Sequence, residues 1–107
     1  HILDAIADIE NSVGLSTKDE FLSSKDMRDA NVRRIEIIGE AVKNISVETR
    51  RTYSKIEWNK IAGTRDKIIH HYFGVDWDIV WYIITQEISP LKEKIKIIVT
   101  DFKRENS

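Results

Sequence analysis

Apolar residues recur at helical spacing along most of the chain. The first run predicts a helix over residues 2–13, which Gly14 ends. Its apolar face consists of Ile2, Ile6, Ile9 and Val13. The chain has one proline and four glycines, and no stretch shows the sustained alternation of apolar and polar residues that marks a half-buried strand. The pattern therefore predicts an all-α protein.

Residues that favour helix ends divide the first half of the chain. The stretch TKDE, from Thr17 to Glu20, has the form of a capping box and predicts the start of a short helix. Ser24 predicts the N-cap of the longest helix, which runs to about Ile45. Gly39 lies inside this helix, where glycine costs about 1 kcal/mol relative to alanine, so we expect it to permit a close crossing with another helix. The apolar stripe of this helix consists of Met27, Ala30, Ile35, Ile38, Ala41, Val42 and Ile45.

The second half is divided in the same way. Ser46 opens a short helix, and the next helix begins near Glu57 or Trp58 and ends at Gly74. Asp76 predicts the N-cap of the following helix. The stripe of that helix consists of Trp77, Val80, Trp81, Ile84 and Ile88.

A serine–proline pair predicts the start of the last helix. Ser89 and Pro90 suit the N-cap and the first helical position. The apolar stripe that follows consists of Leu91, Ile95, Ile98 and Phe102. The sum is four or five helices with short connections, and no linker divides the chain. This pattern favours an antiparallel four- or five-helix up-and-down bundle in one domain, residues 1–107.

Composition narrows the class of protein. A chain of 107 residues suffices for one domain with a real core. The absence of cysteine excludes disulfides and thiolate metal ligands. No apolar run approaches the roughly 20 residues that span a bilayer, and no signal peptide is visible. We therefore expect a cytoplasmic protein with no membrane association.

Charge is distributed unevenly along the chain. The net charge is −1, with −3 in residues 1–25, +3 in residues 26–71 and −1 in residues 72–107. The whole chain therefore lacks the basic balance of a typical nucleic-acid binder. Any surface that binds anions should be local and lie in the central part of the chain. Ordinary solvated helix faces would explain the same distribution.

Two polar residues fall on an apolar stripe in the helix that ends at Gly74. Arg65 and Tyr72 point within about 20° of each other and share a face with Trp58, Ile61 and Ile68. A buried arginine is costly unless it is paired or faces a site filled by water or an anion. Alternatively, Arg65 reaches solvent or pairs with Asp66 or Glu40, and Tyr72 is a core residue with its hydroxyl at the rim.

The long helix shows the same departure from its pattern. Asn31 and Arg34 fall inside its apolar arc. Polar residues on two inward-facing stripes indicate a polar site or a polar patch of a subunit interface. Asn31 and Arg34 are therefore predicted to line a cleft.

The adjacent histidines point away from Arg65. On an ideal helix His70 lies about 140° from Arg65, and His71 about 120° the other way. Either the helix distorts towards Gly74, or a site is assembled across a two-fold axis from two chains. A third reading is a pair of structural histidines near a helix C-terminus, where imidazolium is favoured.

Several chemistries can be set aside. Adjacent histidines point to different sides of a helix, and no H-E-x-x-H pattern accompanies them, so no metal site is expected. Glycine-rich phosphate loops and the G-x-S-x-G turn are also missing from the sequence. An arginine–histidine pair suits phosphodiester chemistry, because histidine moves protons near neutral pH and arginine stabilises charge on phosphate. RNA supplies its own nucleophile, the 2′-hydroxyl, so no cofactor is needed.

At these residues the chain resembles a known family. The stretch RDKIIHHY matches the pattern R-x4-H-x-Y, with Arg65, His70 and Tyr72 in register. This is similar to the HEPN superfamily, and within it to the HepT-type toxins of two-gene toxin–antitoxin modules. The resemblance covers most of the chain and includes the stretches IEIIGEAVKNIS, IEWNKIAGTRDKIIHHYFGVD, DIVWYII and ISPLKEKI.

The resemblance implies a two-fold homodimer of helical bundles and a metal-independent endoribonuclease that cleaves RNA in a cleft lined by both motifs. By position, Arg65 would stabilise the scissile phosphate, His70 would transfer the proton and Asp66 would orient them. Tyr72 would be adenylylated by the partner, a minimal nucleotidyltransferase antitoxin, and the added nucleotide would obstruct the cleft. His71 occupies a variable position of the motif and is interpreted as a spectator.

Two other functions stay open at this point. In a non-catalytic HEPN module that binds a nucleotide or a partner nucleotidyltransferase, Arg65 would contact phosphate but no bond would break. In a purely structural helical dimer, no polar cleft would surround Arg65.

Overall fold

The computed structural model describes residues 2–64, 68 and 75–105, and these residues form helices joined by short connections. No strand occurs in this part of the chain, so the all-α prediction is confirmed. The elements are α1 (Ile2–Val13), α2 (Lys18–Ser23), α3 (Lys25–Lys43), α4 (Val47–Thr52), α5 (Trp58–Ala62), α7 (Trp77–Tyr82), the π-helix η1 (Ile83–Glu87) and α8 (Ile88–Glu105).

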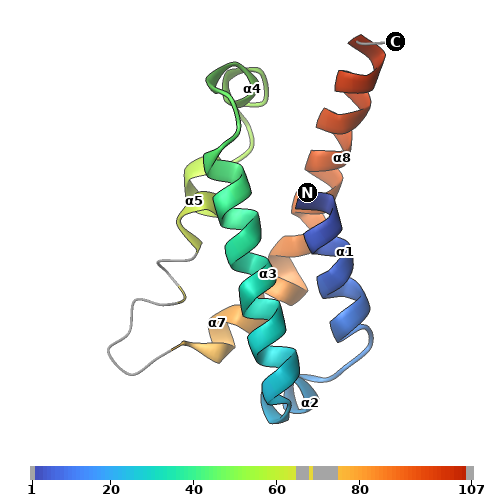
Figure 1. Ribbon diagram of the computed structural model, residues 1–107, viewed down its shortest axis with the longest axis vertical. Helices are drawn as coiled ribbons and strands as arrows, with labels where there is room; N and C mark the ends of the chain where they lie inside the picture. Colours follow the sequence, from blue (N-terminus) through green and yellow to red (C-terminus); the bar gives the residue numbers. More distant parts are fainter. Residues whose placement is uncertain (1, 65–67, 69–74, 106–107) are drawn as a thin grey trace.

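Neighbouring long helices run antiparallel, as predicted. Figure 1 shows α1 descending from the N-terminus, with α3 and α8 both rising beside it. Helix α1 packs against α3 and α8, and α3 also packs against α5. An ion pair of 2.8 Å between Lys92 Nζ and Glu10 Oε1 joins α8 to α1, and it raises the pKa of Lys92. The arrangement confirms an up-and-down bundle.

Local capping confirms the predicted end of the first helix and the predicted starts of the next two. Gly14 ends α1 with a φ of +51°, in the left-handed region that favours glycine. The Thr17 hydroxyl accepts from the Glu20 N–H, and the Glu20 carboxylate accepts from the Thr17 N–H. The Ser24 hydroxyl likewise accepts from the Met27 N–H at the start of α3. Each of these caps depends on residues at most four apart in sequence, which explains why the sequence predicts them.

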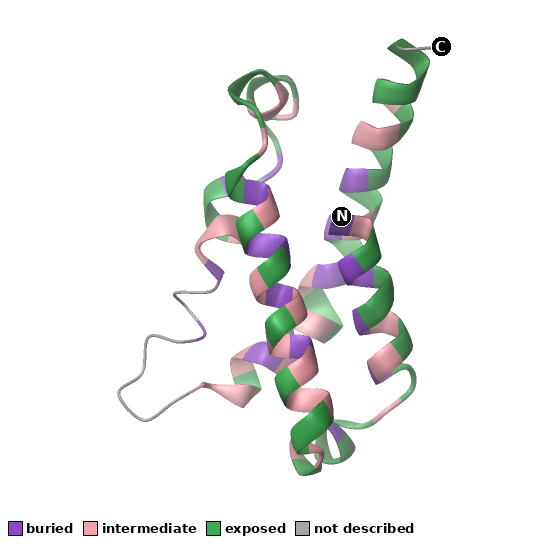
Figure 2. Cartoon of the chain, viewed as in Figure 1, coloured by how far each residue is buried: buried purple, intermediate pink, exposed green. Residues whose placement is uncertain are grey.

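The core lies between α1, α3 and the α7–α8 segment (Figure 2). Its fully buried side chains include Phe21, whose ring contacts Trp77 and Trp81 with centroid distances of 6.5 and 5.3 Å. These contacts confirm the two tryptophans as packing residues. The buried apolar residues of the three longest helices are Ile2, Ala5, Ile6, Ile9, Val13, Ile35, Ile38, Val42, Ile88, Leu91 and Ile95.

The last two predicted helices form one continuous helical run. α7, η1 and α8 follow one another without a break from Trp77 to Glu105, so the prediction that Ser89 and Pro90 start a new helix is wrong. Proline has no N–H, and its ring crowds the carbonyl oxygen four residues earlier, here that of Gln86. Gln86 lies in η1. The wider π turn accommodates the proline inside the helical run.

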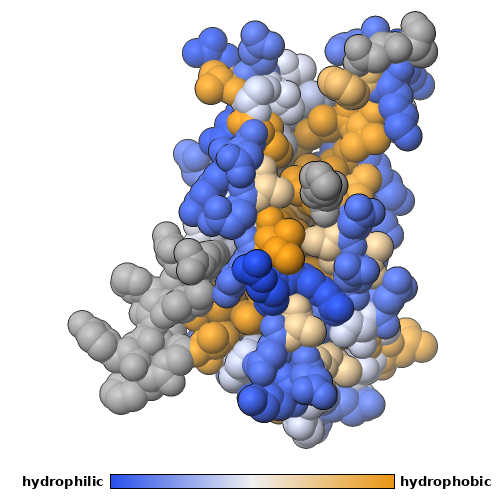
Figure 3. All heavy atoms as spheres, in the orientation of Figure 1, coloured by the Kyte–Doolittle hydropathy of each residue, from blue (hydrophilic) through white to orange (hydrophobic). Residues whose placement is uncertain are grey.

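The surface is mostly polar but carries single apolar residues. Figure 3 shows apolar atoms on the upper part of α8. Ile97 and Phe102 of this helix are 57% and 65% exposed. Isolated apolar residues are common on protein surfaces and indicate no site by themselves. None of the described helices combines the length and the apolar character needed to cross a membrane.

Candidate functional site

The three motif residues, Arg65, His70 and Tyr72, lie outside the described residues, as do Asp66 and His71. Their predicted roles therefore stay predictions. The described residues before, within and after this stretch show how the neighbouring helices are arranged.

The predicted apolar stripe is confirmed where it can be followed. Trp58 is buried at the start of α5, Ile61 is half-buried, and Ile68 is fully buried. Thr64 is also buried, and its hydroxyl donates to the Lys60 carbonyl at 3.1 Å. α5 ends at Ala62 with Gly63 as its C-cap, so the prediction of one unbroken helix from Glu57 or Trp58 to Gly74 is wrong at Gly63. Buried positions nevertheless occur directly before position 65 and at position 68.

The Asp76 N–H donates to the Ile68 carbonyl in a long hydrogen bond of 3.4 Å, so residues 68 and 76 lie side by side. The Asp76 carboxylate also accepts from the N–H groups of Asp78 and Ile79, which confirms it as the N-cap of α7. Position 68, inside the motif, is therefore held against the start of α7.

Gly39 allows α5 to approach α3 closely. A Cβ at this position would lie 3.6 Å from the Ala62 carbonyl oxygen and 3.7 Å from that of Ile61. The backbone of α5 therefore passes directly over Gly39, which confirms the predicted close crossing. The crossing involves Ile61 and Ala62, which precede the motif by a few residues in sequence.

Asn31 and Arg34 come together on the side of α3 that faces α1. The fully buried Asn31 amide donates to the Ser12 hydroxyl at 3.2 Å and to the Met27 carbonyl at 2.8 Å. Arg34 Nη1 donates to Asn31 Oδ1 at 3.1 Å and to the Asp8 carbonyl at 3.4 Å. These bonds join α1 to α3. The further role predicted for both residues, lining a cleft, stays a prediction.

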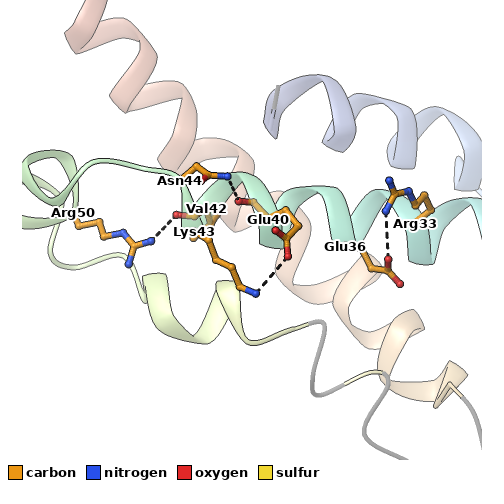
Figure 4. A network of polar contacts seen from close by, with 7 residues as sticks. All are labelled: Arg33, Glu36, Glu40, Val42, Lys43, Asn44 and Arg50. Carbon is orange, nitrogen blue, oxygen red and sulfur yellow. Dashed lines mark hydrogen bonds and ion pairs between the residues drawn. The ribbon is translucent and has the colours of Figure 1, made fainter.

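Charged side chains form ion pairs along α3. Figure 4 shows Arg33 paired with Glu36 and Lys43 paired with Glu40, at 3.5 and 3.4 Å. Glu40, which the sequence offered as a partner for Arg65, is thus engaged by Lys43, although its side chain is 55% exposed. Exposed pairs of this kind are weak and leave both groups free to exchange partners.

A small, mostly apolar pocket of about 180 Å³ adjoins Thr64 between α3, α5, η1 and α8. Its volume is below the usual range for ligand sites, which begins near 300 Å³. Its lining residues are Ile35, Ile38, Glu57, Lys60, Ile61, Thr64, Ile83, Gln86, Glu87, Ile88, Pro90, Leu91 and Lys94.

A larger and more polar hollow lies at the other end of α5, and the sequence did not predict it. This open groove of about 630 Å³ is called the α4–α5 groove below. It is lined by Arg50, Ser54, Ile56, Glu57, Trp58, Asn59 and Lys60. In the sequence, only the positive charge of the central part of the chain pointed to this groove. Its shape depends on how α4 folds back towards α3, which the sequence does not show.

The described residues bring together no group of three histidine, aspartate or glutamate side chains that could hold a metal ion. The prediction of a metal-independent site concerns the motif, and it stays a prediction.

Comparison with known proteins places the chain in a family. The sequence model of the family described as ribonuclease HepT-like matches residues 2–98. The all-α bundle and the R-x4-H-x-Y motif agree with that match. The chain belongs to the HepT-like family of the HEPN superfamily, and the resemblance inferred from sequence is confirmed.

Individual relatives cover nearly the whole chain. A Methanocaldococcus jannaschii protein, named as a gamma-glutamylcyclotransferase and candidate RNase, is 43% identical over 104 residues, which are 97% of this chain and 47% of that protein. A candidate RNase of Caldanaerobacter subterraneus subsp. tengcongensis is 47% identical over 85% of this chain and 80% of its own length. A candidate ribonuclease HepT of Thermococcus cleftensis is 40% identical over 89% of this chain and 86% of its own.

The chain therefore spans about half of the first of these relatives and at least four-fifths of the other two. No solved structure matches the chain.

Proposed function

We propose that this protein is a metal-independent endoribonuclease that acts as the toxin of a toxin–antitoxin module. One observation carries the proposal. The ribonuclease HepT-like family matches residues 2–98, and this range includes the complete motif of Arg65, His70 and Tyr72. The relatives named as candidate RNases support the same activity.

The chemistry follows from the types of residue in the motif. The RNA 2′-hydroxyl attacks the adjacent phosphorus, the bond to the 5′-oxygen breaks, and the products carry a 2′,3′-cyclic phosphate and a 5′-hydroxyl. His70 transfers the proton, because imidazole exchanges protons near neutral pH. Arg65 donates hydrogen bonds to the phosphate oxygens and stabilises the charge that develops on them. Asp66 supports this pair by orienting it.

The site is proposed to form between two chains. On an ideal helix the side chains of Arg65 and His70 diverge by about 140°, so one straight helix cannot aim both at one phosphate. A two-fold homodimer removes this difficulty, because one chain supplies the arginine and the other supplies the histidine to the same cleft.

Regulation is proposed to act at Tyr72. The residue shares a helix face with Arg65 on an ideal helix. A minimal nucleotidyltransferase antitoxin that adenylylates the Tyr72 hydroxyl would add a bulky, negatively charged group beside the arginine. The modification would both block the cleft and compete with RNA phosphate for Arg65.

The test is RNA cleavage by the purified protein in the presence of a chelator. We expect products that end in 2′,3′-cyclic phosphate, and a loss of activity of at least a hundredfold in His70→Ala, since general acid–base catalysis contributes about 10²–10⁴-fold. Arg65→Ala should show a loss of similar size.

His71→Ala is the matched control, because it removes the neighbouring imidazole and should retain activity. Equal cleavage by the wild type, Arg65→Ala and His70→Ala would contradict the assignment. Binding of short RNA or ATP without turnover would instead favour a non-catalytic HEPN module.

A further inference from the structure

The α4–α5 groove lies in the most basic part of the chain. Residues 43–60 carry five basic and two acidic side chains, a net charge of +3. Because the whole chain carries −1, the rest of it carries −4. The lining of the groove itself carries Arg50, Lys60 and Glu57, a net charge of +1. The groove thus lies within a basic stretch of an otherwise acidic chain, which favours a polyanion at this place.

Arg50 gives the groove a fixed cation. Its Nη2 donates to the Val42 carbonyl at 2.7 Å, so its guanidinium is held at the C-terminal end of α3 (Figure 4). Its Nε is buried and has no hydrogen-bond partner. Among the described residues Arg50 has no carboxylate partner either, so its charge is balanced only by the carbonyl end of α3. The buried Nε cannot reach a ligand, but Arg50 is half-buried and lines the groove, so its terminal guanidinium nitrogens can bind a phosphate there.

Lys60 gives the groove a second, movable cation. Its Nζ lies 3.5 Å from a Glu57 carboxylate oxygen and 4.0 Å from one of Glu87, and its side chain is 55% exposed. These long, exposed contacts contribute little free energy, so the ammonium can turn to a phosphate at small cost. Ser54 and Asn59 also line the groove and are exposed, and they add neutral hydrogen-bond donors.

The walls of the groove are held in place by the fold. The Tyr53 hydroxyl donates to Asp101 Oδ2 at 2.7 Å, which ties the end of α4 to α8. The Trp58 Nε1–H donates to the Tyr53 carbonyl at 3.1 Å. The indole of Trp58 is only 6% exposed, so the groove offers no aromatic face on which a base could stack. Its donors therefore suit the sugar–phosphate backbone rather than the bases.

The groove is close to the motif along the chain. Lys60 belongs to α5 and precedes Arg65 by five residues. Five residues span at most about 18 Å even when fully extended. A strand cleaved at the motif can therefore reach the groove with a phosphate a few nucleotides away from the scissile one.

We propose that the α4–α5 groove, with Arg50 and Lys60, binds the backbone phosphates of single-stranded RNA beyond the cleavage site. This subsite rests on the proposed function for its substrate. It gives affinity without sequence preference, because phosphates carry no base information. It also accounts for RNA binding by a chain whose net charge is −1.

The experiment measures RNA binding and RNA cleavage separately. Binding of a labelled oligoribonucleotide of about 12 nucleotides is followed by fluorescence anisotropy in the His70→Ala background, which keeps the RNA intact. Cleavage is followed with the same RNA and with a dinucleotide, which has a single phosphate and cannot reach the groove.

Two substitutions should act in opposite directions. Lys60→Gln should raise Kd and KM for the longer RNA roughly fivefold, and should lower the slope of log Kd against log salt by about 0.7, the value for one phosphate contact to a single strand. Glu57→Gln removes a carboxylate from the same groove and should lower Kd about twofold. Neither variant should change kcat or the KM of the dinucleotide. A folding defect cannot produce opposite signs.

Lys25→Gln is the matched control, since it removes one exposed lysine at the start of α3, away from the groove. If Lys60→Gln and Glu57→Gln bind the longer RNA as Lys25→Gln does, the groove proposal is wrong. It is also wrong if the two variants alter only association with a protein partner such as a nucleotidyltransferase.

Failure of the proposed function has a different signature. In that case the wild type cleaves neither RNA, while the binding measurements still decide whether the groove holds RNA.

Discussion

A buried amide holds the first two long helices together. The side chain of Asn31 is fully buried and bonds to Ser12, Met27 and Arg34. A buried polar group is tolerated only when it is hydrogen-bonded, and these three contacts meet that need. Asn31 therefore stabilises the packing of α1 against α3. This role is independent of its predicted place in the lining of a cleft.

Asn31→Ala should lower the free energy of unfolding by about 1–3 kcal/mol, because it leaves the Ser12 hydroxyl and an Arg34 donor without their partner. Urea denaturation measures this change. Asn11→Ala is the control, since Asn11 is exposed on α1, and its effect should stay within about 0.5 kcal/mol of zero. Equal effects of the two substitutions would show that the buried network contributes nothing.

Side-chain hydrogen bonds were predictable where donor and acceptor are close in sequence. The capping side chains of Thr17, Ser24 and Asp76 each bond within three residues, so the sequence alone shows donor and acceptor. Arg50 differs, because its partner is a backbone carbonyl eight residues away that only the fold exposes. For the same reason the sequence showed central positive charge without showing the α4–α5 groove.

At the scale of elements, the α3–α5 crossing depends on the small size of Gly39. A Cβ there meets two α5 carbonyl oxygens at ordinary contact distance, so one methyl group fits and a larger side chain does not. The crossing was predictable because glycine inside a helix costs about 1 kcal/mol relative to alanine, and close packing against another helix is a common cause of its presence.

Gly39→Ala should raise the free energy of unfolding by up to about 1 kcal/mol, through better helix propensity. Gly39→Leu should lower it by about 1–3 kcal/mol, because α5 must move away. Gly14→Ala is the contrast, since φ is +51° there and the same substitution should destabilise by about 1 kcal/mol. Urea denaturation of the three variants checks the signs, and destabilisation by Gly39→Ala would mean that the crossing cannot accept a methyl group.

The contact between Tyr53 and Asp101 ties α4 to α8, and it predicts a pH dependence. The hydrogen bond to Asp101 is the main cause that raises the pKa of Tyr53, with burial and the charges of Asp101 and Glu105 adding to it. A raised pKa in the folded state means that the stabilisation is present below the unfolded pKa of about 10 and is lost as pH rises through the folded value.

The wild type should therefore exceed Tyr53→Phe in its urea midpoint near pH 8, and the difference should shrink as pH rises above about 10. In an Asp101→Ala background the same substitution should give no such pH-dependent difference. A difference that stays constant with pH in the wild-type background would show that the phenol does not titrate against this carboxylate.

The junction between η1 and α8 shows where element prediction failed. Serine followed by proline is a strong helix-start signal, yet Ser89 and Pro90 lie inside a continuous helical run. Ile83, the first residue of the π turn, and Ile88, directly after it, are both buried in the core, so packing outweighs the local signal. Tertiary burial of this kind is not visible in a capping pattern.

At the scale of the whole molecule, the bundle is thin. Its principal extents are 46, 30 and 18 Å, and the shortest of these fits two layers of helices whose axes lie about 8–10 Å apart. A two-layer bundle has broad faces that helices of a second chain can cover. The fold was predictable from helical periodicity, and the family from the R-x4-H-x-Y motif together with the stretches that surround it. The proposed two-chain site could not be predicted from periodicity, because it would depend on a contact between chains that one sequence does not reveal.

The proposed two-chain site makes a prediction that only the assembled molecule can test. Light scattering should give twice the mass of one chain. Arg65→Ala and His70→Ala should each be inactive alone, and mixing them under conditions of subunit exchange should restore part of the activity. In mixed dimers one cleft then holds an intact arginine from one chain and an intact histidine from the other.

Mixing Arg65→Ala with a chain that carries both substitutions is the control, because no cleft then contains an arginine and it should stay inactive. If the two single variants exchange subunits and still cleave no RNA, each motif must act within its own chain. In that case the helix has to bend between Arg65 and His70, since an ideal helix separates their directions by about 140°.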